Sequence, residues 1–272
     1  MLSRPSSPGN GLSLGMAGFA ADWLALRAPA DARARNRQVA DALTEAFAGH
    51  QGLTILDLGA GTGNNMAMTA PLLPMPQRWI LVDSDPALLD RAVAPAGVEI
   101  IRRIADLADG LAPLLQTMPD LVTASALFDL AGRDWIADAA AALARARLPL
   151  HAVLSYTGSE IWRPSHPLDD KALAAFHADQ QRDKGLGPAL GPQAHRALAE
   201  ALSAMGYRIV EGASDWVLER PRDAALIGAM AEGSAAAIAP TLGPDTDTWL
   251  AARRTATWLR VSHSDLLALP PD

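Results

Sequence analysis

The chain has 272 residues, half of them hydrophobic, which is enough for one large α/β domain or for a domain with a modest addition. Its formal net charge of −7 excludes a general attraction to phosphate backbones, so we expect no nucleic-acid partner. Because the sequence has no cysteine, disulfides, thiolate nucleophiles and thiolate metal sites are excluded as well.

The N-terminal residues carry no pattern of an export signal. Residues 1–15 are interrupted by prolines and glycines, so we expect a flexible tail there and not a signal peptide. No stretch approaches the roughly 18 uninterrupted apolar residues of a membrane-spanning helix. We therefore expect a soluble, cytoplasmic protein with no membrane partner.

Two helices are predicted before the first strand. Residues 22–48 have apolar positions at helical spacing, and Pro29 interrupts them. We expect residues 16–50 to form an N-terminal helical lid.

Five strands then alternate with helices. The strands are short apolar runs, expected at residues 54–58, 79–82, 98–101, 121–124 and 150–156. Helices are expected from residue 64 and at 86–93, 111–115 and 133–147. This alternation with short connections predicts a doubly wound, mostly parallel sheet with helices on both faces.

The last third of the chain is less regular. Residues 157–192 are expected to form an insertion around one helix, 169–184, at the carboxyl ends of the strands, where ligands of such sheets bind. Further elements are expected as a helix at 193–205, a hairpin of 207–211 with 216–219, and helices at 224–238 and 246–261. The last two helices would make a C-terminal extension, 222–272, that braces the lid or pairs two subunits in a homodimer.

A glycine-rich turn follows the first strand. Gly59, Gly61 and Gly63 form G-x-G-x-G and not the G-x-G-x-x-G of most dinucleotide folds, and Asp57 lies at the strand end before them. Such a turn, where it opens a helix, presents bare backbone N–H groups to a ligand. The spacing favours a ligand other than a pyrophosphate.

This segment resembles the first motif of the class I S-adenosylmethionine-dependent methyltransferases. The resemblance covers about residues 50 to 220 and implies a methyltransferase core at 51–221 with seven strands, the last antiparallel to the rest. It also implies S-adenosyl-L-methionine as cofactor and S-adenosyl-L-homocysteine as product.

Acidic residues follow the next two strands. Asp83 is placed to accept hydrogen bonds from both ribose hydroxyls, while Asp83-Ser84-Asp85 before Pro86 also fits a helix cap, and both roles can hold together. The resemblance implies that Asp106 and Leu107 hold the adenine, although an aspartate in a loop is also a common cap. The cofactor-binding candidates are Asp57, Gly59, Ala60, Gly61, Gly63, Asn64, Asp83, Ser84, Asp106, Leu107, Ser125 and Arg35.

Arg35 belongs to a group of arginines in the N-terminal helices. A guanidinium from this group is a candidate to hold the methionyl carboxylate as the lid closes. The alternative is a solvated basic face that pairs with neighbouring aspartates.

The fourth strand ends in small residues, Ser125 and Ala126, which leave room for a reacting centre. Asp129 would stand at the rim of this site, to orient or deprotonate a substrate or to cap the helix that begins near Arg133. The segment lacks the Asn/Asp-Pro-Pro-Tyr/Phe motif of enzymes that methylate exocyclic base amines, which argues against such substrates.

Methyl transfer from a sulfonium needs mainly positioning, with a base for the nucleophile in some cases. The catalytic candidates are Asp129, Tyr156, His166 and His177. A single histidine in a loop is more often only solvated. The six histidines show no metal-ligand spacing, so no metal is expected.

These observations favour a methyltransferase that acts on a small molecule, at a nucleophilic oxygen, nitrogen or carbon. An RNA or protein methyltransferase, an NAD-dependent reductase and a catalytically silent cofactor-binding domain are the alternatives. The glycine spacing and the lack of a Tyr-x-x-x-Lys pair argue against the reductase. The fold alone does not separate the others.

Overall fold

The structure, a computed structural model, describes residues 21–271. Within this range an eight-stranded sheet has the order β3-β2-β1-β4-β5-β8-β6, and β7 also pairs with β8. The strands are β1 (Leu53–Leu58), β2 (Gln77–Asp83), β3 (Val98–Ile104), β4 (Leu121–Ser125), β5 (Leu150–Arg163), β6 (Arg208–Ala213), β7 (Trp216–Glu219) and β8 (Trp258–Leu269). Strands β1 to β5 are parallel, and β8 is antiparallel to β5, β6 and β7. The predicted fold class is confirmed, with one strand more than expected.

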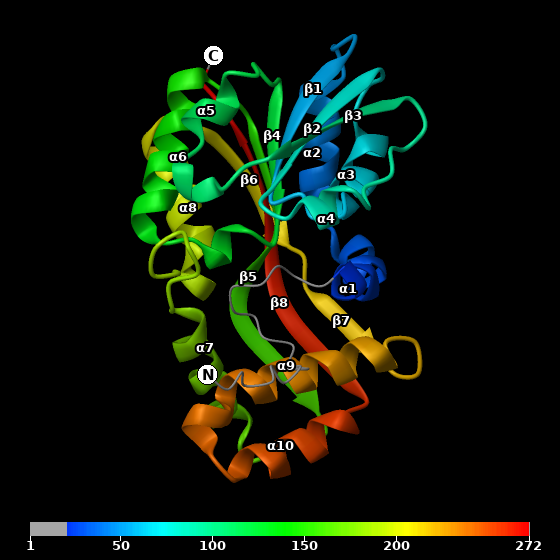
Figure 1. Ribbon diagram of the computed structural model, residues 1–272, viewed down its shortest axis with the longest axis vertical. Coiled ribbons are helices and arrows are strands. Elements are labelled where there is room, and N and C mark those ends of the chain that lie inside the picture. The colour runs from blue at the N-terminus through cyan, green and yellow to red at the C-terminus, as the bar shows by residue number, and fades with distance from the viewer. Residues whose placement is uncertain (1–20, 272) are drawn as a thin grey trace, which may run out of the picture.

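Helices cover both faces of the parallel strands (Figure 1). The α-helices are α1 (Ala21–Ala34), α2 (Arg37–Phe47), α3 (Asn64–Thr69), α4 (Pro86–Leu89), α5 (Ala112–Leu115), α6 (Arg133–Ala146), α7 (Asp169–Gln180), α8 (Ala194–Ala204), α9 (Ala224–Leu242) and α10 (Asp245–Arg254). Short 3-10 turns lie at Ala70–Leu72, Leu107–Asp109, Phe128–Leu130 and Gly191–Gln193. The alanine- and leucine-rich faces of α6 and α8 pack against one side of the sheet, and α2, α3 and α4 pack against the other.

A second hydrophobic core lies beyond the carboxyl ends of β1 to β4. Strands β5 and β8 are long enough to leave the parallel sheet and continue into this region, where α7, α9 and α10 surround them (Figure 1). Large apolar side chains such as Trp162, Trp216, Ile227 and Trp249 fill it. We call this part, formed by α1, α7, α9, α10, β7 and the outer halves of β5 and β8, the lower module.

The expected hairpin is wrong, and the helix expected at 246–261 is present only as far as Arg254. Strands β6 and β7 each pair with β8 and not with each other, because β8 lies beside both of them. Helix α10 ends at Arg254, and burial then alternates along Leu259, Val261 and His263 as in a strand. Residues 258–269 are therefore part of the sheet itself and not of a helical extension beyond it, because β8 is one of the inner strands.

The boundary between the first two helices also differs from the prediction. Pro29 lies inside α1, and the break comes at residues 35–36. Asn36 caps α2 there by accepting a hydrogen bond from the Val39 N–H, and the carboxylate of Asp265 accepts one from the Asn36 N–H at 2.9 Å. The cap and the contact with β8 set the break.

Helix α9 is long and apolar enough, by length and composition, to cross a membrane. Its residues Leu226, Ile227, Ala231 and Ile238 are instead buried in the core of the lower module. We therefore describe it as a core helix.

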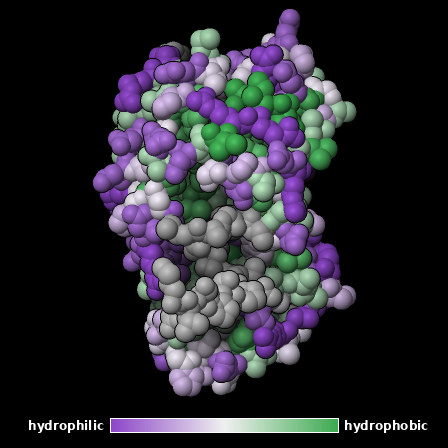
Figure 2. Space-filling view, in the orientation of Figure 1, coloured by the Kyte–Doolittle hydropathy of each residue, from purple (hydrophilic) through white to green (hydrophobic). Residues whose placement is uncertain are grey.

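Most of the surface visible in Figure 2 is polar, with hydrophobic residues gathered over the upper part of the molecule, where β2 and β3 lie in Figure 1. Strand β3 is an edge of the sheet, and its Ile101 and Ile104 are exposed.

Candidate functional site

The glycine turn lies between β1 and α3, at the carboxyl edge of the sheet. Gly59, Gly61 and Gly63 have φ angles of 62°, 53° and 80°, a region that residues with a Cβ seldom adopt. A Cβ at Gly61 would come within 2.9 Å of Leu24 in α1, so this helix lies directly on the turn. Asn64 fixes this arrangement by donating a hydrogen bond to the Leu24 carbonyl at 2.8 Å.

Asp83 ends β2 beside this turn. Its two carboxylate oxygens accept hydrogen bonds from the Gly61 N–H (2.8 Å) and the Asp85 N–H (2.9 Å), and the side chain keeps partial exposure. Asp85, and not Asp83, caps α4 by accepting from the Ala87 N–H, and Ser84 is exposed between the two acids.

Asp57 is fully buried under the turn. Its Oδ1 accepts a hydrogen bond from Asn65 Nδ2 at 2.7 Å, and Asn65 also donates to Thr123. Burial raises the pKa of Asp57 to about 7, against the opposing effects of the Asn65 hydrogen bond and of the Arg35 charge. Asp57 therefore supports the turn from below and does not line an open surface.

Arg35 lies between α1 and α2 and reaches the same network. Its Nη2 donates to Asn65 Oδ1 at 2.8 Å, which connects it to Asp57. Its Nε and Nη1 are buried and have no hydrogen-bond partner among residues 21–271. Burial lowers the pKa of Arg35, opposed by the charges of Asp265, Asp31 and Asp57. The structure thus brings this candidate to the glycine turn, with two donors left over.

Asp106 and Leu107 follow β3 at the same edge. The Ala105 N–H donates to the Asp83 carbonyl, which places the ends of β2 and β3 side by side. Asp106 is exposed and caps the next 3-10 turn by accepting from the Ala108 N–H, and the Leu107 carbonyl accepts from the Trp135 indole. The cap is what the structure shows, and the adenine contact stays a prediction.

At the end of β4, Ser125 is half-buried and is followed by Ala126 with a φ of 51°. A non-glycine residue in this region is uncommon and marks a constrained site. Asp129 lies in the next 3-10 turn, where burial raises its pKa and its Oδ1 has no partner in the described part of the chain. It does not cap α6, whose N-cap is Gly132 without a side-chain hydrogen bond, so that alternative is wrong.

Two of the other catalytic candidates meet. Tyr156 Oη on β5 and His177 Nε2 on α7 are 3.0 Å apart. Burial raises the pKa of Tyr156 and lowers that of His177, so both groups are neutral at pH 7. His166 plays a local part instead, since its Nδ1 accepts a hydrogen bond from the Leu168 N–H just before α7.

Sequence reasoning missed three residues near this site. Asn65 joins Asp57 to Arg35, and Asp265 on β8 holds the start of α2. Glu160, farther along β5, has a buried Oε1 without a partner among residues 21–271. Their positions follow from the pairing of distant segments, and only Asn65, the second residue after the glycine motif, gave a local signal.

Comparisons with known proteins bear on the fold. No protein-family model and no curated protein matches the chain. Among solved structures, YcgJ from Bacillus subtilis is 11% identical with a TM-score of 0.50, covering 87% of this chain and 100% of its own. A proposed methyltransferase from Bacillus halodurans is 12% identical with a TM-score of 0.50, covering 86% and 99%. A cyclopropane-fatty-acyl-phospholipid synthase-like protein from Lactobacillus casei is 17% identical with a TM-score of 0.51, covering 94% and 96%.

At these identities the likeness concerns the fold alone. The chain has the Rossmann-like fold of class I S-adenosylmethionine-dependent methyltransferases, as the resemblance of its glycine motif implies.

Proposed function

We propose that the protein is an S-adenosylmethionine-dependent methyltransferase that transfers a methyl group in line to an oxygen, nitrogen or carbon of a small molecule. One observation carries the proposal. The left-handed glycine turn, the carboxylate of Asp83 and the unpartnered N–H groups of Arg35 gather around one carboxyl edge of the sheet. Ligands of doubly wound sheets bind at this edge.

The residues fit this cofactor by chemistry. Asp83 with Ser84 offers acceptors for ribose hydroxyls, and the Gly61 N–H holds the Asp83 carboxylate at the turn. Asp106 and Leu107 would hold the adenine, and the two free donors of Arg35 suit the methionyl carboxylate. When bound, S-adenosylmethionine supplies a methyl group on a positively charged sulfur.

The chain itself contributes positioning and proton handling. Helix α1 covers the glycine turn through Leu24 and so keeps water from it. Asp129 and the Tyr156–His177 pair lie beyond the end of β4, at the place where the acceptor would enter. A neutral His177 is able to accept a proton, directly or through Tyr156. A small acceptor fits best, because the lower module leaves these groups buried or half-buried.

Titration calorimetry with S-adenosylmethionine, S-adenosylhomocysteine and NADH tests the proposal. We expect heat with the first two only. Asp83→Ala should weaken S-adenosylhomocysteine binding by about 2 kcal/mol, or roughly thirtyfold, because two ribose hydroxyls lose a charged acceptor. Asp90→Ala, which removes an exposed carboxylate just after α4, is the matched control and should bind normally.

Two results would contradict the proposal. Well-folded protein that gives no heat with S-adenosylhomocysteine has no such cofactor site. Protein that binds the cofactor but releases no S-adenosylhomocysteine with a broad pool of metabolites is a cofactor-binding regulatory domain.

A further inference from the structure

Strand β3 forms an outer edge of the sheet (Figure 1). The Ala105 N–H donates to the Asp83 carbonyl on β2, so the odd-numbered residues of β3 direct their backbone groups to β2 and the even-numbered residues direct theirs outward. Among residues 21–271, the outward N–H groups of Ile100, Arg102 and Ile104 meet no acceptor. Such an edge is a template for pairing with another strand.

The edge lacks the features that usually prevent such pairing. Strand β3 contains no proline or lysine, and most of its residues are apolar and β-branched. Ile101 and Ile104 are 39% and 65% exposed, and Figure 2 shows hydrophobic residues gathered in this part of the molecule. Arg102 does not shield the edge, because its guanidinium donates to the carbonyls of Leu89 and Ala92 at α4. The strand therefore exposes apolar side chains together with free backbone groups.

The other charges of β3 are arranged symmetrically about Ile101. Glu99 lies two residues before it and Arg103 two residues after it, and alternate residues of a strand share one face of the sheet. Glu99 accepts a hydrogen bond from Arg78 through Oε2 at 3.0 Å, which leaves Oε1 for another cation. Arg103 has only a contact of 3.4 Å with the Pro113 carbonyl among residues 21–271. Each end of this face thus has a charge that the opposite end of a second copy would match.

We propose that two copies of the chain form a homodimer by antiparallel pairing of their β3 strands about a two-fold axis at Ile101. In this register Glu99 of each copy faces Arg103 of the other, and the two Ile101 side chains face each other. These are the pairs without mutual backbone hydrogen bonds, whose side chains come closest in an antiparallel ladder. Ile100 and Arg102 of opposite copies exchange backbone hydrogen bonds, which satisfies the outward groups of the edge.

The neighbouring registers fit less well. A register centred on Arg102 would place this arginine opposite its own equivalent, and like charges in that position are destabilising. A register centred on Ile100 would place Glu99 opposite Ile101. The registers between these would set the outward backbone groups of one copy against the inward groups of the other. Of these arrangements, only the register about Ile101 satisfies both the backbone and the charges.

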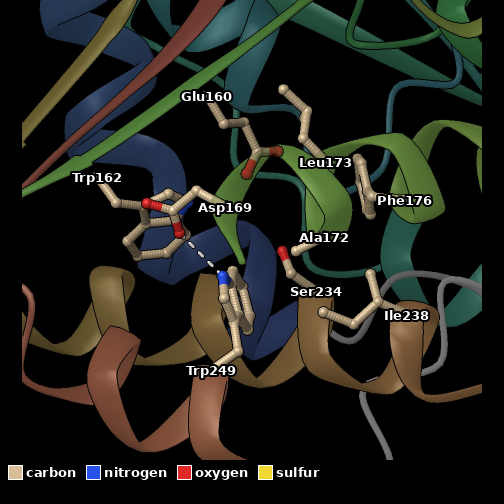
Figure 3. A pocket seen from close by; sticks show the side chains of 9 residues that line it. All are labelled: Glu160, Trp162, Asp169, Ala172, Leu173, Phe176, Ser234, Ile238 and Trp249. Atoms are coloured by element: carbon tan, nitrogen blue, oxygen red, sulfur yellow. Dashed lines mark hydrogen bonds between the residues drawn. The ribbon is translucent and has the colours of Figure 1, made fainter. Parts of the chain in front are cut away.

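The C-terminal helices, which we first expected to pair two subunits, offer less to a second copy. Helices α9 and α10 direct Ile238 and Trp249 inward, and the Trp249 indole donates to Asp169 of α7 at 2.9 Å (Figure 3). Among residues 21–271, no large hydrophobic side chain of α9 or α10 is exposed, whereas Ile101 and Ile104 of β3 are. We therefore place the dimer contact at β3.

Sedimentation velocity on the full chain tests this inference. The wild type should reach the mass of a dimer, twice the 28.5 kDa of the chain, below about 100 μM, a range that covers a micromolar Kd. Ile101→Lys places two lysines face to face at the axis and should weaken the dimer at least about tenfold. Ile161→Lys, the same change at a β5 side chain that is 41% exposed, is the matched control and should stay dimeric.

An exchange of charges tests the register itself. Glu99→Arg and Arg103→Glu should each weaken the dimer, because each variant places like charges opposite one another at both ends of the pairing. An equimolar mixture of the two variants should form a heterodimer, since both facing pairs are then opposite in sign. This mixture also keeps the test valid if Ile101→Lys does not fold, which circular dichroism checks.

Three results would overturn the inference. The first is a wild-type chain that stays monomeric up to about 100 μM, where a micromolar Kd would show. The second is a dimer of Ile101→Lys as tight as that of the wild type, which would mean that another surface pairs the subunits. The third is a mixture of Glu99→Arg and Arg103→Glu that associates no better than either variant alone.

Discussion

At the level of single residues, Arg35 is the least satisfied charge beside the glycine turn. Its guanidinium gives one hydrogen bond to Asn65, while Nε and Nη1 find no acceptor among residues 21–271. Leaving buried donors unpaired costs stability, and a structural arginine would be expected to satisfy them. The arrangement is that of a group prepared for an anionic ligand.

Replacing Arg35 by methionine separates a binding role from a structural one. We expect S-adenosylhomocysteine binding to weaken at least about tenfold, because the carboxylate loses a charged donor. The free energy of unfolding should change by less than about 1 kcal/mol, because an apolar side chain replaces a poorly compensated buried charge. Calorimetry and urea denaturation measure the two quantities. Arg37→Met, at an exposed site two residues on, is the control. A large loss of stability with unchanged affinity would assign Arg35 to the fold.

Asp57 makes stability depend on pH. In the folded protein its pKa is about 7, while an unfolded aspartate titrates near 4, so the folded state binds more protons between these values. Its contribution to the free energy of unfolding is therefore fully present below pH 4 and is lost as the pH rises to about 7. At about 1.4 kcal/mol per pKa unit the loss amounts to a few kcal/mol.

Asp57→Asn removes this titration. The melting temperature of the variant should fall less between pH 5 and pH 8 than that of the wild-type protein, as followed by circular dichroism. Asp138→Asn changes an exposed carboxylate in α6, and its melting temperature should change with pH as that of the wild-type protein does. Identical slopes in all three proteins would mean that Asp57 titrates normally in the folded state.

Among the elements, β8 holds the two halves of the molecule together. Its buried Asp265 accepts a hydrogen bond from the Leu154 N–H at 2.8 Å and another from the Asn36 N–H at 2.9 Å. Leu154 has a φ of 54° and lies at an irregularity of β5, where the strand turns out of the parallel sheet. One carboxylate thus fixes both the bend of β5 and the start of α2.

Asp265→Ala should destabilise the protein by about 3 kcal/mol, because it leaves two backbone N–H groups without acceptors. Asp265→Asn keeps one acceptor, so its free energy of unfolding should lie between those of the alanine variant and the wild type. Urea denaturation gives these values. Ser264→Ala, which removes a single hydroxyl contact to the Gly212 carbonyl, should cost less than about 1 kcal/mol. Equal stability of Asp265→Ala and Ser264→Ala would contradict this role.

Whether a strand could be predicted from the sequence depends on how many of its residues are buried and apolar. Strands β1 and β2 are buried on both faces, so they are rich in apolar residues, as in residues 79–82 of β2, and were predicted within a few residues. Strand β8 carries Ser262, His263, Ser264 and Asp265 in its middle. Because this polar run interrupts the apolar pattern of a strand, the sequence did not predict β8. Without β8, the neighbouring strands β6 and β7 could only be paired with each other.

The candidate site divides in the same way. The glycine turn, Asp57 and Asp83 lie where strands end, and each is marked by the residues beside it in the sequence. The environments of Glu160 and Asp265 depend on the register of β5 with β8. No short-range pattern encodes these long-range contacts.

In the whole molecule, α1 joins the glycine turn of the sheet to the rest of the lower module. Asp31 accepts a hydrogen bond from the Trp216 indole, and Arg33 forms an ion pair with Asp223 at 2.6 Å, so one side of α1 belongs to the lower module. Leu24, at its other end, lies on the glycine turn and accepts a hydrogen bond from Asn64. A ligand in the turn must therefore contact or displace α1, and whether this helix acts as the predicted lid depends on which of the two occurs.

Hydrogen exchange followed by mass spectrometry tests this coupling over the full chain. Saturating S-adenosylhomocysteine should slow amide exchange in α1 and in the glycine turn, because ligand contacts stabilise both segments against local opening. Amides of α6 and α8, which pack on one face of the sheet away from the turn, are the internal reference and should change little. If the glycine turn is protected while α1 exchanges as before, α1 is a fixed part of the lower module. If α1 exchanges faster, the ligand displaces it, and the helix is an obstacle to binding and not a lid.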